Sequence, residues 1–62
     1  MCEADAYVIK DGEEKIVMKA VDMIEPEGDD GYRIVDIFGE QRIVKGRIIG
    51  MHLVEHKILF EA

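Results

Sequence analysis

Residues 2–19, CEADAYVIKDGEEKIVMK, alternate between two kinds of side chain on either side of a tight turn. Before the turn, Cys2 and the apolar residues at positions 4, 6 and 8 fall on one face of an extended chain, and residues 3, 5, 7 and 9 fall on the other. A period of two is typical of a β-strand that buries one face. This stretch therefore predicts a strand whose small residues point inward.

The Asp11-Gly12 pair predicts the turn that follows. Both central positions of a type I′ turn need positive φ, which aspartate tolerates and glycine adopts freely. We expect a hairpin whose second strand covers residues 14–19, with Ile16 and Met18 turned inward.

The rest of the chain continues the same pattern. Val and Ile together supply 15 of the 62 residues, and glycines recur at short intervals; β-branched residues favour strands and glycines favour the turns between them. Further strands are expected at residues 21–25 (ended by Pro26), 32–38, 41–45, 47–54 and 57–60, with Ile48, Leu53, Ile58 and Phe60 in the core. The predicted fold is all-β: a small single domain, residues 1–62, forming a curled β-barrel of about six to seven short antiparallel strands.

Composition limits the function classes. Eight basic and 14 acidic residues give a net charge of −6, which disfavours nucleic acid because phosphate binding depends on Lys and Arg. No run of roughly 20 apolar residues is available for a membrane helix. The N-terminus lacks the features of a secretory leader, so we expect a cytoplasmic protein. The acidic segment 25–30 favours a solvated turn over a cation site, because it lacks the EF-hand ligand pattern.

Cys2 is the candidate metal ligand. Removal of Met1 would leave the α-amine of Cys2 free beside its thiol. The amine nitrogen, the thiolate sulfur and nearby backbone nitrogens or carboxylates would form a donor set that suits square-planar Ni(II) or Cu(II). Zn(II) is a tetrahedral competitor. The alternative is that Cys2 packs as a small apolar residue. Being the one cysteine, it cannot form an internal disulfide.

Other candidates are weaker. His52 and His56 are four apart, but along a strand this spacing spans about 13 Å, so both are interpreted as surface residues, with a role around the metal or across a dimer left open. The basic residues between positions 41 and 47 are interpreted as a solvated face. The chain contains no serine or threonine and no phosphate-binding glycine loop, so we expect no enzymatic activity.

Several segments together resemble a known family. The start Met1-Cys2-x-Ala4, the strand ending near Val8-Ile9, and the closing segments 46–53 (GRIIGMHL) and 57–60 (KILF) are similar to the CooT family of small nickel-binding proteins over nearly the whole chain. The resemblance implies a cytoplasmic homodimer that binds Ni(II) through Cys2 and is associated with maturation of nickel-containing carbon monoxide dehydrogenase. Related proteins have also been labelled RNA-binding. The chain departs from the family at Glu3, where an apolar residue is common.

A homodimer also agrees with size, because a chain this short buries only about 60% of the surface that its unfolded form exposes. A weaker likeness connects the Met-Cys start to the HypC group of hydrogenase-maturation chaperones, whose longer C-terminal helix this chain lacks. The alternative function is a small β-barrel module that binds RNA or protein without a functional metal.

Overall fold

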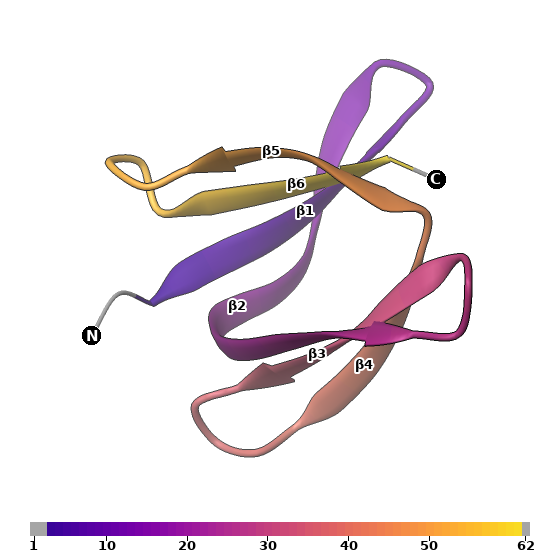
Figure 1. The fold of residues 1–62 in the computed structure, drawn as a ribbon. Helices are drawn as coiled ribbons and strands as arrows, with labels where there is room; N and C mark the ends of the chain where they lie inside the picture. Colours follow the sequence, from indigo (N-terminus) through magenta and orange to yellow (C-terminus); the bar gives the residue numbers. More distant parts are fainter. Residues whose placement is uncertain (1–2, 62) are drawn as a thin grey trace.

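The computed structural model describes residues 3–61, which form six β-strands. Figure 1 shows them curling around a common interior. The strands are β1 (Ala4–Lys10), β2 (Glu13–Glu27), β3 (Gly31–Asp36), β4 (Gln41–Lys45), β5 (Arg47–His52) and β6 (Lys57–Glu61). The all-β prediction is confirmed. Cys2 lies outside the described residues.

The six strands belong to one sheet, in the order β4-β3-β2-β1-β6-β5. Among the described strands, β4 and β5 are the two ends of this order, and they follow each other in the chain through Gly46. The sheet is therefore curled but not closed, so the predicted barrel holds only loosely. The expectation of purely antiparallel strands was wrong, because β1 pairs with β6 in parallel. A parallel pair needs a long connection, and here the connection is most of the chain.

β2 is one long strand where the sequence predicted two. Ala20 adopts a left-handed φ of 54°, and the strand bends near it, so that residues up to Val21 pair with β1 and residues from Val21 onward pair with β3. Pro26 does not end the strand, contrary to expectation. It pairs with Tyr32 of β3 in a stretch that has no described partner on its other side, a position where proline's missing N–H is tolerated.

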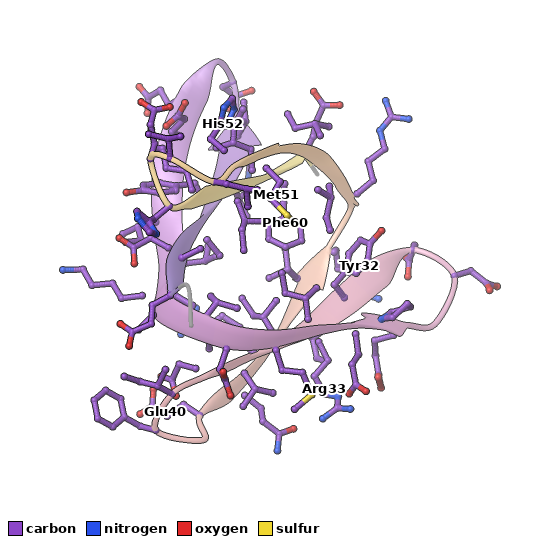
Figure 2. The ribbon with its side chains drawn as sticks, turned by 60° about the vertical axis from the view of Figure 1, so that its left-hand side comes forward. Tyr32, Arg33, Glu40, Met51, His52 and Phe60 are labelled. Carbon is purple, nitrogen blue, oxygen red and sulfur yellow. The ribbon has the colours of Figure 1, made fainter. Side chains whose placement is uncertain are left out.

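The core lies inside the curl. Ile34 and Phe60 are its fully buried large side chains, and the Tyr32 and Phe60 rings meet at 5.7 Å between centroids. Figure 2 shows both rings on the inner side of the ribbon, with Arg33 pointing outward. The buried apolar residues among those described are Ala6, Met18, Val21, Ile34, Val44, Ile58 and Phe60. The inward face predicted for β1 is confirmed, since Ala4 and Val8 pack against this cluster.

Two predicted core residues are exposed. Ile16 is 43% exposed because it lies in the β1–β2 hairpin arm, which projects beyond the other strands in Figure 1. Leu53 is 70% exposed because β5 ends at His52, so Leu53 lies in the turn that follows. Ile48, Ile58 and Phe60 do contribute to the core.

Asp36 shapes the β3–β4 turn. Its Oδ1 accepts hydrogen bonds from the backbone N–H groups of Phe38 and Glu40, each at 2.9 Å. Asp36 is 8% exposed, whereas Phe38 is 84% exposed. β3 therefore ends at Asp36, two residues earlier than predicted, and the turn presents a phenylalanine ring to solvent.

Candidate functional site

The beginning of β1 lies against the turn between β5 and β6. The Asp5 N–H donates to the carbonyl oxygen of His56 at 2.8 Å, and Nδ1 of the His56 ring is 3.1 Å from the carbonyl oxygen of Glu3. Glu3 is the residue that follows Cys2. His56 thus contacts the first described residues of the chain both through its backbone and through its side chain.

The other side of β1 is held by β2. Oδ1 of Asp5 accepts a hydrogen bond from the N–H of Ala20 at 3.1 Å, at the point where β2 bends. The left-handed φ of Ala20 costs conformational energy for a residue with a Cβ, and the bond to Asp5 offsets part of that cost. The start of β1 is therefore fixed between the bend of β2 and the β5–β6 turn.

A pocket of about 170 Å³ opens beside this position. Both histidines line it, together with side chains from β1, β2 and β5; the lining residues are Ala4, Val21, Asp22, Ile24, Met51, His52, Leu53, His56, Lys57 and Ile58. Figure 2 shows Met51 and His52 next to each other on β5. The lining is mostly apolar, and its polar side chains are the two imidazoles together with Asp22 and Lys57.

The two histidine rings have different described partners, Glu3 for His56 and Glu55 for His52. Nδ1 of His52 lies 4.0 Å from a carboxylate oxygen of Glu55, and the His52 side chain is half exposed. Within residues 3–61, no three His, Cys, Asp or Glu side chains gather closely enough to hold a metal ion.

Lys57 is the basic residue of the pocket lining, which also contains Asp22. Its Nζ lies 2.9 Å from Oε1 of Glu14 and 4.9 Å from the centre of the Tyr7 ring. The hydrogen bond that Lys57 donates to the Glu14 carboxylate raises the pKa of Lys57 above its ordinary value. This pair connects β6 to the β1–β2 hairpin arm.

The acidic turn and the basic residues are spread over the surface. Gly28 makes the β2–β3 turn with a φ of 69°, and Asp29 and Asp30 are exposed, as predicted for a solvated turn. Lys45 lies 3.6 Å from Asp30, and Arg47 lies 3.6 Å from Glu61. These ion pairs reduce the positive charge that the basic segment offers to a phosphate backbone.

The fold and site define a small, curled, single-sheet β-domain in which the start of β1 is fixed beside a mostly apolar pocket. The family model described as "CO dehydrogenase accessory protein CooT" matches residues 1–61. The chain belongs to the CooT family. This description names an accessory protein and not a catalyst, in agreement with the expectation from the sequence.

A solved structure supports the same assignment. The chain is similar to a crystal structure from Carboxydothermus hydrogenoformans described as a CooT, with 33% sequence identity, a TM-score of 0.89, and coverage of 97% of this chain and 95% of that chain. No match was found among curated proteins. In the part of the chain that the structure describes, no helix has the length and apolar character needed to span a membrane.

The sequence had no signal for the contact between Glu3 and His56. The two residues are 53 positions apart, and the contact depends on the parallel pairing of β1 with β6. Both histidines are exposed, as interpreted from the sequence. The sequence carried no sign that they line one pocket.

Proposed function

We propose that the protein is a nickel-binding accessory protein that assists maturation of carbon monoxide dehydrogenase in the cytoplasm. The observation that carries this proposal is the family match over residues 1–61, supported by the similarity to the crystal structure at 33% identity. In this proposal Ni(II) is the cargo, and the protein binds it as a homodimer.

Cys2 is proposed as the nickel ligand, through its thiolate together with its α-amine and backbone nitrogens. Sulfur and nitrogen donors in a planar arrangement suit Ni(II). Among the described residues, the carbonyl oxygen of Glu3, the residue that follows Cys2 in the sequence, lies 3.1 Å from Nδ1 of His56.

The homodimer is supported by the surface. In residues 3–61, nine large apolar side chains are exposed: Ile16, Met23, Ile37, Phe38, Ile43, Ile49, Met51, Leu53 and Val54. A second copy would cover part of this surface. A two-fold axis near the N-termini would bring two Cys2 thiolates to one metal ion, and a stoichiometry of one ion per protomer would contradict that arrangement.

A nickel titration of the protein with its authentic N-terminus tests the proposal. The readouts are ultraviolet charge-transfer absorbance and native mass spectrometry, and the controls are Cys2→Ser and a form that retains Met1. We expect saturable binding that both controls lose. Binding that persists in Cys2→Ser, or its absence from the unmodified protein, would refute the assignment of Cys2.

A protein-interaction module is the second candidate, favoured by one observation. Phe38 and Val54, which are 84% and 93% exposed, lie in two turns; exposed apolar side chains of this kind suit contact with a protein better than contact with RNA. This candidate predicts that Cys2→Ser leaves partner affinity unchanged. An RNA partner would be revealed by binding that falls steeply with salt.

A further inference from the structure

The contact between His56 and the start of β1 has a defined direction. A carbonyl oxygen only accepts hydrogen bonds, so at 3.1 Å the Nδ1 of His56 carries the proton and donates it to the Glu3 carbonyl. In the neutral ring this leaves Nε2 as an acceptor. The backbone carbonyl oxygen of His56 also accepts a hydrogen bond from the N–H of Asp5, at 2.8 Å. The peptide units on either side of Ala4 are therefore both bonded to one residue of the β5–β6 turn.

The backbone of His56 is left-handed in the conformation that makes both bonds. Its φ is 57°, in a region that glycine adopts freely and that histidine, like asparagine, enters more often than most residues with a Cβ. Glycine could therefore form the turn alone. The turn itself does not require the ring of His56, whose described partner is the carbonyl oxygen of Glu3.

We propose that His56 is a positioning residue for the nickel donors of Cys2, acting through the Glu3 carbonyl. This inference rests on the proposed function. A ligand loses less conformational freedom on binding a metal when the backbone next to it is already fixed. Through its hydrogen bond, His56 fixes the carbonyl group of Glu3, the residue that follows Cys2, before any metal binds.

The test compares four forms of the full-length protein. His56→Gly removes the ring, and the variant should fold because glycine adopts positive φ without strain. His56→Asn also tolerates this φ and keeps a short side-chain N–H donor. His52→Asn is the matched control, because His52 lines the same pocket but its ring faces Glu55.

We expect His56→Gly to bind Ni(II) about three- to tenfold more weakly, the range that one hydrogen bond provides, with an unchanged thiolate charge-transfer band. His56→Asn should recover most of the affinity, and His52→Asn should match the unmodified protein. Equal affinity in His56→Gly, or His56→Asn as weak as His56→Gly, would overturn the inference. A changed band in both His56 variants would identify the imidazole as a direct ligand and also overturn it.

The metal-free protein provides a readout that does not depend on nickel. NMR order parameters of the backbone N–H groups at Glu3 and Ala4 should fall in His56→Gly and stay unchanged in His52→Asn. If order falls while nickel affinity is unaffected, His56 is a structural residue only and the inference is refuted. If the unmodified protein does not bind nickel, or if Cys2→Ser binds equally well, the proposed function itself fails.

Discussion

Replacement of Asp36 by alanine should destabilise the domain through the β3–β4 turn. One carboxylate oxygen of this buried residue accepts two hydrogen bonds of 2.9 Å, from the backbone N–H groups of Phe38 and Glu40. Hydrogen bonds to a charged group contribute about 1.5–3 kcal/mol each. Phe38 and Glu40 are themselves exposed, so water can reach the freed N–H groups, and the expected loss for the pair is about 2–3 kcal/mol.

This loss is large for so small a chain. At about 0.05–0.15 kcal/mol per residue, a 62-residue domain has a free energy of unfolding of roughly 3–9 kcal/mol. Urea unfolding followed by far-ultraviolet circular dichroism measures the difference, with the slope m checked for constancy. Asp36→Asn is the matched variant, because it keeps an acceptor oxygen in the same place and should lose less than about 1 kcal/mol.

Two results would refute this reasoning. In the first, the free energy of unfolding of Asp36→Ala lies within about 0.5 kcal/mol of that of the unmodified protein, the range typical of ordinary surface substitutions. In the second, Asp36→Asn is as unstable as Asp36→Ala, which would mean that the charge matters and the two hydrogen bonds do not.

Three further predictions concern other parts of the sheet. Glu14 raises the pKa of Lys57, so as pH rises from neutral the stability that this pair contributes is retained up to the ordinary lysine value of 10.5 and is lost as pH rises through the raised value; on this alkaline side the difference in Tm between the protein and Glu14→Gln should therefore vanish above pH 10.5. Gly31→Ala places a Cβ 2.9 Å from the carbonyl oxygen of Val44 and should cost about 1–3 kcal/mol in urea unfolding; an unchanged midpoint would show that β3 and β4 separate freely. Phe38→Ser should change the free energy of unfolding by less than about 0.5 kcal/mol, because the ring is 84% exposed, and a larger loss would show that the ring is covered.

Local signals in the sequence predicted several elements well. Asp11 and Gly12 adopt the positive φ values, 53° and 78°, that the predicted turn requires, and β4 has the bounds that were expected for residues 41–45. Both depend on neighbouring residues only. Backbone preference and a period of two are enough to identify such elements.

Features that depend on distant residues could not be predicted. Ala20 has a left-handed φ although alanine has no preference for it, because Asp5, 15 residues earlier, bonds its N–H. The exposure of Ile16 follows from the projection of the hairpin arm, and that of Leu53 follows from where β5 ends. The pocket and the contact between Glu3 and His56 likewise depend on the parallel pairing of β1 with β6.

The prediction of Cys2 as a metal ligand came from its chemistry and its position in the sequence. Cys2 lies outside the described residues, so this stays a prediction. Among the described residues, the His56 ring contacts the carbonyl oxygen of Glu3, and His52 lines the same pocket as His56. Neither relationship follows from the spacing of the two histidines along the chain.

X-ray absorption at the nickel edge, on the nickel-loaded protein with its authentic N-terminus, tests the central claim most directly. The proposal predicts sulfur and nitrogen scatterers around Ni(II) in a planar arrangement, and loss of the sulfur contribution in Cys2→Ser. Nickel surrounded only by oxygen and nitrogen in an octahedral arrangement, in a spectrum that Cys2→Ser leaves unchanged, would contradict it.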